Sequence, residues 1–234
     1  MSVDPEPRST CADSAQFVRV GPPDTPSECA IGQRADILQT ILEPDVQLAI
    51  WTRGASSQIR DEVEQAGLDA LRDLRVPLQG QPSEQDLSAL VAAAGADIDR
   101  CRAWVADMAQ LLGYFFGLLA PLKTPHSVRL RIESPADDAC RRFHVDRSRL
   151  RLLCTYRGPG TEWLAEDQVD RHALATHQPN ERILRFGEPR RLEPFWVAVM
   201  KGDHLPGNAG RGLVHRSPPI AGTGRRRLLF CLDA

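Results

Sequence analysis

The strongest constraint on this chain is a change in its sequence pattern near Pro121 and Pro125. Beyond them, short apolar and β-branched runs are separated by Gly, Pro and Asp. The runs cover residues 127–134, 141–145, 149–156, 182–186, 194–200, 212–216 and 225–233. Many short strands with turn signals between them are typical of a sandwich or a jelly roll. The C-terminal half is therefore predicted to form a β domain.

The region before this change is predicted to be a tail followed by helices. Residues 1–33 contain several prolines and little periodic apolar pattern, which indicates a flexible tail. Residues 34–122 are predicted to form a helical support region that includes a strand-like run at 45–53. Helices are expected at about 56–74, 83–94 and 97–119, with Ser83 as an N-cap and an apolar face on the last helix.

Charge is distributed unevenly along the chain. The net charge of -2 argues against a general nucleic-acid binder. Residues 1–125 hold 10 Lys and Arg against 18 Asp and Glu, whereas residues 126–234 hold 19 against 13. Nearly all of these later positive charges are arginines, whose planar fork of donors suits carboxylates and phosphates. The C-terminal half is thus the better place for an anionic ligand, although scattered solvated arginines would give the same count.

The cysteines and the apolar runs bear on localisation. The six cysteines form no CxxC pair, so we expect reduced thiols in a cytoplasmic protein. The N-terminus lacks the apolar stretch of a signal peptide. The longest apolar run, residues 108–122, is short for a hydrocarbon core of about 30 Å. It is predicted to be a buried core helix and not a membrane segment.

The segment FHVDR, residues 143–147, carries the candidate metal ligands. Side chains two residues apart on a strand point to the same face, so His144 and Asp146 project together. A histidine and a carboxylate from one strand leave room for a third ligand and for open positions, as in the 2-His-1-carboxylate sites of non-haem Fe(II) oxygenases. The pair alone is weak evidence, because a histidine hydrogen-bonded to a nearby aspartate gives the same pattern.

His215 is the predicted third ligand, and His204 is its rival in an expected loop. Arg225 follows ten residues after His215 and opens the last predicted strand, where Arg227 shares its face and Arg226 points away. A guanidinium one strand from the metal would suit the far carboxylate of a chelating dicarboxylate. We favour Arg225 over Arg227 for this role.

The order of these motifs resembles that of the 2-oxoglutarate- and Fe(II)-dependent dioxygenases, and most of all their prolyl-hydroxylase-like branch. The shared order is HxD, a glycine-rich turn, Gly-Asp, His, and then Arg, over about residues 126–234. The resemblance implies an α+β protein in which residues 123–234 form a double-stranded β-helix, a jelly-roll or cupin-like barrel. It implies Fe(II) and the cosubstrate 2-oxoglutarate, with the iron held by His144, Asp146 and His215.

The same resemblance implies that Tyr156 helps to hold the cosubstrate and that Thr161 matches a threonine of the glycine-rich turn. That turn reads GPGTEW here and departs from the GGET of the branch. As a whole, the chain resembles an uncharacterised bacterial family whose genes neighbour zinc-homeostasis genes. Residues 1–120 match no dioxygenase feature.

These features predict an oxygenase that hydroxylates a small molecule or a protein side chain, with an anionic substrate as one option. Two alternatives remain open. One is a cupin-type metalloenzyme with the same ligands and no 2-oxoglutarate, and the other is a non-catalytic metal-binding or regulatory module linked to metal homeostasis. An inward-facing arginine separates them, because a sensor or buffer does not need one.

Overall fold

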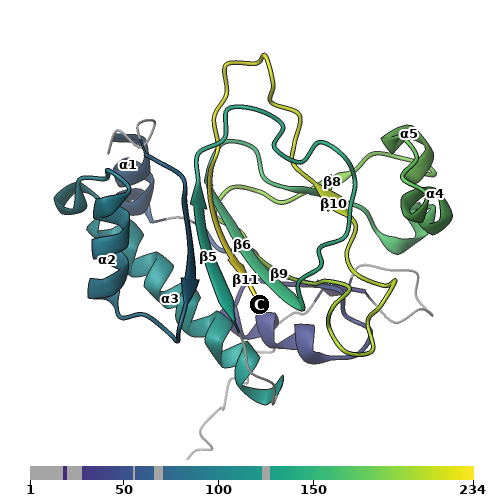
Figure 1. Ribbon diagram of the computed structural model, residues 1–234, viewed down its shortest axis with the longest axis horizontal. Coiled ribbons are helices and arrows are strands. Elements are labelled where there is room, and N and C mark those ends of the chain that lie inside the picture. The colour runs from purple at the N-terminus through teal and green to yellow at the C-terminus, as the bar shows by residue number, and fades with distance from the viewer. Residues whose placement is uncertain (1–17, 20–27, 55, 66–70, 123–126) are drawn as a thin grey trace, which may run out of the picture.

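The computed structural model describes residues 18–19, 28–54, 56–65, 71–122 and 127–234. Their strands form an eight-stranded sheet of order β1-β2-β3-β9-β6-β11-β5-β4 and a three-stranded sheet of order β10-β7-β8. Helices α1 to α3 lie on one side of the large sheet, and the small sheet with α4 and α5 lies on the other (Figure 1). The chain is therefore an α+β protein.

The strands of the large sheet are β1 (Val18–Arg19), β2 (Cys29–Gly32), β3 (Leu48–Trp51), β4 (Leu74–Leu78), β5 (Val128–Glu133), β6 (Leu150–Arg157), β9 (Val197–Lys201) and β11 (Leu228–Asp233). Those of the small sheet are β7 (Glu162–Trp163), β8 (Arg190–Arg191) and β10 (His215–Arg216). The helices are α1 (Ser57–Gln65), α2 (Glu84–Ala93), α3 (Arg102–Leu119), α4 (Arg171–Ala175) and α5 (Asn180–Ile183). Short 3-10 helices cover Ala35–Leu42, Ile98–Arg100, Ala120–Leu122 and Glu166–Gln168.

The large sheet joins the two halves of the chain. Its pairs are antiparallel except for β2 with β3, which are parallel. Strand β3 pairs with β9 and β4 pairs with β5, so the sheet crosses the boundary predicted near residue 122. Strand β2 lies at the end of the segment predicted as a tail and is a paired strand instead. Residues 1–17 and 20–27 of that segment lie outside the described residues.

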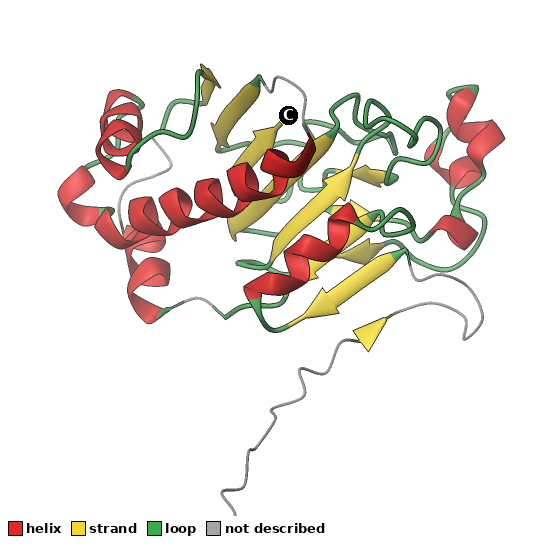
Figure 2. Cartoon of the chain, turned by 90° about the horizontal axis from the view of Figure 1, so that it is seen from below, coloured by secondary structure: helices red, strands yellow, loops and turns green. Residues whose placement is uncertain are grey.

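The main core lies between the large sheet and α3. Because side chains alternate along a strand, β6 turns Leu152, Cys154 and Tyr156 toward the helices and Arg151 and Thr155 toward the small sheet. Figure 2 shows α3 lying along the sheet. The segment Arg102–Leu122 is long and apolar enough to cross a membrane by length and composition, and 44% of its most apolar window is buried against the rest of the protein.

A second apolar cluster fills one half of the space between the two sheets. It contains Cys29, Leu48, Ile50, Leu153, Trp163, Leu192, Ala198, Met200 and Leu213. The other half lies over β6, β11 and β5. There the large sheet presents Arg151, Asp233 and Arg131, which the structure joins in ion pairs. The space between the sheets therefore has an apolar side and a polar side.

The structure confirms one local sequence prediction and corrects three others. The N-cap at Ser83 is confirmed, since its hydroxyl accepts a hydrogen bond from the Asp86 backbone. Residues 182–186 were predicted as a strand, but Arg182 and Ile183 end α5, and Leu184 forms only an isolated bridge with Val169. Residues 141–145 form only an isolated bridge at His144. The last strand begins at Leu228, not at 225.

Candidate metal centre

His144 and His215 are brought together by backbone pairing. The amide of each donates to the carbonyl of the other, at 3.0 Å in both directions, so the two residues lie directly opposite each other in an antiparallel bridge. Opposed residues in such a pair project their side chains to the same face. The two imidazole rings accordingly lie with centroids 4.5 Å apart.

Alternation along the chain places the third member of the group. Phe143 and Val214 point away from the space between the sheets, into an apolar cluster with residues of the α4–α5 segment. Because side chains alternate, His144 and His215 point into that space. Asp146 follows His144 by two residues and faces the same space. Its Oδ1 lies 3.6 Å from Nε2 of His144, and its Oδ2 lies 3.3 Å from Nε2 of His215.

These three residues could hold a metal ion, since one ligand atom from each lies within 4.8 Å of the others. The hydrogen bonds of the histidines support this. Nδ1 of His144 lies 2.9 Å from the Arg142 carbonyl, and Nδ1 of His215 lies 3.1 Å from the Leu213 carbonyl. A carbonyl accepts only from N–H, so each Nδ1 is the donor, and each Nε2 is the atom turned toward Asp146 and left for a metal ion. Both histidines are thereby set as Nε2 ligands.

The electrostatics of the group favour its metal-binding protonation states. Burial lowers the pKa of His215 to about 4, against the opposing pull of Asp146, so this imidazole is neutral at pH 7. Burial opposes ionisation of Asp146, but its contacts with His215, His144 and Arg151 outweigh burial and hold its pKa well below the usual range. A neutral imidazole and a carboxylate are the forms that bind a divalent cation.

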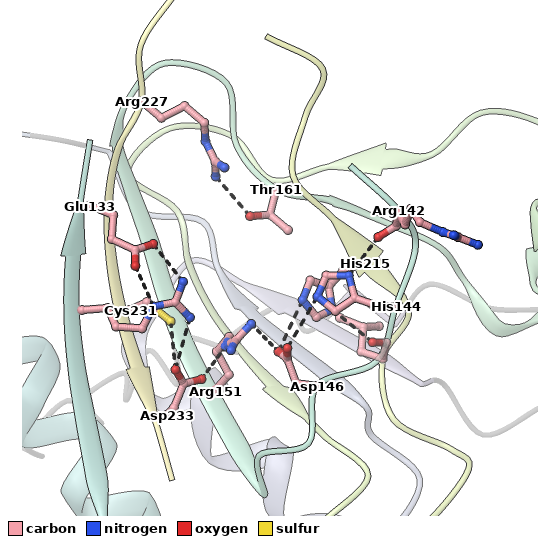
Figure 3. Close-up of polar contacts among 12 residues, drawn as sticks. Glu133, Arg142, His144, Asp146, Arg151, Thr161, His215, Arg227, Cys231 and Asp233 are labelled. Atoms are coloured by element: carbon pink, nitrogen blue, oxygen red, sulfur yellow. Dashed lines mark hydrogen bonds and ion pairs between the residues drawn. The ribbon is translucent and has the colours of Figure 1, made fainter. Parts of the chain in front are cut away.

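A line of ion pairs runs from Asp146 across the polar side of the large sheet (Figure 3). Nη1 of Arg151 lies 2.5 Å from Oδ2 of Asp146, and Nε of Arg151 lies 2.5 Å from Oδ1 of Asp233. Asp233 then contacts Arg131 at 3.4 Å, and Arg131 pairs with Glu133 at 2.8 Å. Three adjacent strands, β6, β11 and β5, thus support the carboxylate of the group.

Arg227 lies in the same interior and has a different environment. It is 2% exposed, and its Nη2 donates to the hydroxyls of Thr155 and Thr161 at 3.3 Å each. Among the described residues it has no ion pair, and its Nε is buried without a hydrogen-bond partner. Burial lowers its pKa to about 10. Figure 3 shows its guanidinium projecting between the sheets toward Thr161.

The structure reverses the preference for Arg225 over Arg227. Arg225 lies before the start of β11 on an exposed turn, outside the space between the sheets, whereas Arg227 points inward. Tyr156 is also misplaced by the sequence prediction. It faces the helices, where its hydroxyl donates to Asp107 at 2.5 Å. His204 is exposed in a turn and is not part of the group.

The sequence analysis missed Arg151, Asp233 and Thr155. A signal for Arg151 and Thr155 was present in the alternation of residues 150–157, where every second residue is apolar and these two lie between. The same alternation assigns Tyr156 to the apolar face. Assigning each residue to a face of the strand, in addition to its chemical type, would have identified Arg151 and Thr155.

The fold and the site together define an α+β protein with a His–Asp–His group between a large and a small sheet. The chain belongs to the family described as "Protein of unknown function (DUF1826)", whose members' pattern matches residues 32–233. No curated protein matches the sequence.

Solved structures with a similar arrangement include several oxygenases. A dioxygenase for auxin oxidation from rice is 16% identical, with a TM-score of 0.46 and coverage of 79% of this chain and 72% of that one. Its Arabidopsis thaliana counterpart, solved with 2-oxoglutarate, is 14% identical, with a TM-score of 0.42 and coverage of 85% and 76%. A Pseudomonas putida prolyl-4-hydroxylase is 12% identical, with a TM-score of 0.38 and coverage of 85% and 96%.

Proposed function

We propose that this protein is a 2-oxoglutarate-dependent oxygenase that binds Fe(II) through His144, Asp146 and His215. The observation that carries the proposal is that two different groups lie in the same space between the sheets. One is the histidine and carboxylate set, in which both Nε2 atoms face the Asp146 carboxylate, and the other is the buried guanidinium of Arg227 without a carboxylate partner among the described residues. We further propose that the two sheets form a distorted double-stranded β-helix.

The donor set fits Fe(II). Two imidazoles and one carboxylate on one side of an ion leave open positions for a chelating cosubstrate and for oxygen, which is the arrangement of non-haem Fe(II) oxygenases. The Asp146 carboxylate lies 3.6 Å from Nε2 of His144 and 3.3 Å from Nε2 of His215, so its oxygens and the two Nε2 atoms converge on one place for a cation. A bound metal would bring positive charge to a carboxylate that is already ionised.

Arg227 fits the far carboxylate of 2-oxoglutarate. A buried guanidinium without an anion is costly, and a carboxylate arriving between the sheets would relieve that cost. The Thr155 and Thr161 hydroxyls hold one end of the fork and leave the remaining N–H donors for a ligand. A metal sensor or buffer has no use for such a group, which favours the oxygenase over that alternative.

Bound iron and 2-oxoglutarate would together activate oxygen for hydroxylation of a C–H bond, with 2-oxoglutarate oxidised to succinate and carbon dioxide. The residues of this chain hold the ligands in place. The apolar cluster on one side of the inter-sheet space excludes water there, and the ion pairs on the other side fix Asp146. We propose a small-molecule or protein side-chain substrate and a cytoplasmic location.

An anaerobic calorimetric titration tests the proposal. Wild-type protein should bind one Fe(II) and then one 2-oxoglutarate, and it should release succinate when oxygen is admitted. Arg227→Met should weaken 2-oxoglutarate binding by about tenfold to a hundredfold, since a charge-assisted contact contributes about 1.5–3 kcal/mol, and leave Fe(II) affinity unchanged. Arg225→Gln is the matched control and should bind both ligands like wild type.

The alternatives predict different results. A cupin-type metalloenzyme would bind Fe(II) and show no binding of 2-oxoglutarate in any variant. A metal-binding or regulatory module would prefer another metal, such as zinc, and would show no succinate release with iron.

A further inference from the structure

A cavity of about 590 Å3 lies outside the candidate metal centre, where β6 ends and the chain approaches β11. Three segments line it, at residues 157–160, 191–194 and 224–226, and none of the His–Asp–His group takes part. Four of its lining residues are arginines and one is an acid, namely Arg157, Arg191, Arg225, Arg226 and Glu193. The cavity is therefore strongly positive.

The backbone of the cavity is closely packed. A Cβ at Gly158 would lie 2.4 Å from the Arg226 carbonyl oxygen, and one at Gly160 would lie 1.9 Å from the Leu192 carbonyl oxygen. Only glycine permits these approaches, and Gly158 also has a φ of +80°. The two glycines thus bring the three segments together and fix the positions from which the arginines extend.

Arg191 and Arg225 retain donors for a ligand. Arg191 pairs with Glu162 through Nη2, and Arg226 donates to the Ser134 carbonyl through Nη2. A guanidinium carries five N–H donors, so the Glu162 contact leaves part of the Arg191 fork available. Arg225 is exposed and has no ion pair among the described residues.

We infer that this cavity binds a small molecule that carries a phosphate or diphosphate group. Guanidinium forks match the oxygens of phosphate and bind it bidentately, and a phosphate brings close to two negative charges. The volume lies within the range of about 300–1,000 Å3 that is usual for small-ligand sites. The positive charge is confined to three short segments in a chain of net charge -2, which favours a small anion over a nucleic-acid strand that needs an extended positive track. This inference does not depend on the proposed oxygenase activity.

Calorimetric titration of the full-length protein with inorganic pyrophosphate tests the inference. Wild type should bind with one-to-one stoichiometry, and affinity should fall as salt is raised. Arg225→Gln and Arg191→Gln should each weaken binding by about tenfold or more, because each removes a charge-assisted contact. Arg185→Gln, at an exposed arginine outside the cavity, is the matched control and should bind like wild type.

Three results would overturn the inference. Absent or equal pyrophosphate binding in all four proteins would show that the arginines are only solvated. Displacement of pyrophosphate by 2-oxoglutarate or succinate in an Arg225-dependent manner would assign the cavity to dicarboxylates. Tighter binding of single-stranded RNA that grows with its length would indicate a nucleic-acid surface. Arg191→Gln breaks a pair with Glu162, so its melting temperature is measured, and Arg225→Gln decides the outcome if Arg191→Gln is unfolded.

Discussion

Arg151 holds the carboxylate of Asp146, with Nη1 of the arginine 2.5 Å from Oδ2 of the aspartate. Both side chains are largely buried, at 16% and 10% exposure. Arg151 is itself held by Asp233 on the neighbouring strand β11. The aspartate that we propose as a metal ligand is thus oriented by a side chain from the large sheet, while both histidines belong to the small-sheet side. The Asp146 carboxylate is therefore contacted by residues of both sheets, Arg151 of β6 and His215 of β10.

Arg151→Met should destabilise the protein and make its stability depend more on metal. Removing one partner of a buried ion pair costs about 3–5 kcal/mol, because the remaining charges lie buried without compensation. A bound divalent cation would restore positive charge beside Asp146. Thermal unfolding with and without Fe(II) under anaerobic conditions should show a larger metal-induced rise in melting temperature for Arg151→Met than for wild type.

The control for this experiment is Arg147→Met, at an exposed arginine four residues earlier. It should behave like wild type in both conditions. Equal melting temperatures for Arg151→Met and Arg147→Met would show that the contact with Asp146 contributes little.

Single replacements in the His–Asp–His group should abolish stoichiometric Fe(II) binding. His144→Ala, His215→Ala and Asp146→Asn each remove one of three protein ligands, and asparagine keeps the shape of the aspartate. His204→Ala should retain full binding, because His204 lies exposed in a turn. Metal content after anaerobic loading and desalting measures this. Retention of iron by His215→Ala together with its loss from His204→Ala would reject the proposed third ligand.

Tyr156→Phe should affect stability and leave 2-oxoglutarate binding unchanged. The Tyr156 hydroxyl donates to Asp107, which also forms a two-pronged ion pair with Arg53 at 2.5 and 2.7 Å. Loss of a buried hydrogen bond to a charged group costs about 1.5–3 kcal/mol. Denaturant unfolding should detect this, and titration of 2-oxoglutarate should give wild-type affinity. Weakened cosubstrate binding would return Tyr156 to the role that the sequence resemblance implied.

Sequence patterns predicted the His144–Asp146 pair because its geometry is local, whereas His215 lies 71 residues further along the chain. His144 and Asp146 share a strand-like face, and that relationship follows from alternation alone. The arginine that faces the interior was harder to choose, since it depends on where β11 begins. The strand starts at Leu228 and the preceding turn carries Arg225 outward, which three consecutive arginines do not reveal.

The pairing of strands from the two halves of the chain could not be predicted from the sequence either. Strands β3 and β4 pair with β9 and β5, and the first of these pairs is separated by well over a hundred residues. Nothing in a single sequence specifies such partners. The sequence predicted a helix to about residue 74 and no strand after it, whereas Leu74–Leu78 forms strand β4.

The stability of this protein should rise between about pH 8 and pH 10.5 through Lys201. Lys201 is 4% exposed, and its Nζ donates to the Glu43 and Pro44 carbonyls at 2.6 and 3.2 Å. Burial, followed by the nearby Arg211, lowers its pKa to about 8. Between this value and the unfolded pKa of about 10.4, the unfolded chain binds more protons, so the free energy of unfolding increases with pH. Below pH 8 both states are protonated and the contribution is constant.

Denaturant unfolding of wild type and Lys201→Met across this range isolates the effect, because other titrating groups are common to both proteins. The difference in unfolding free energy should move in favour of wild type by about 1–3 kcal/mol as pH rises. A difference that falls with pH would mean that the two carbonyls stabilise the charged ammonium more than burial disfavours it.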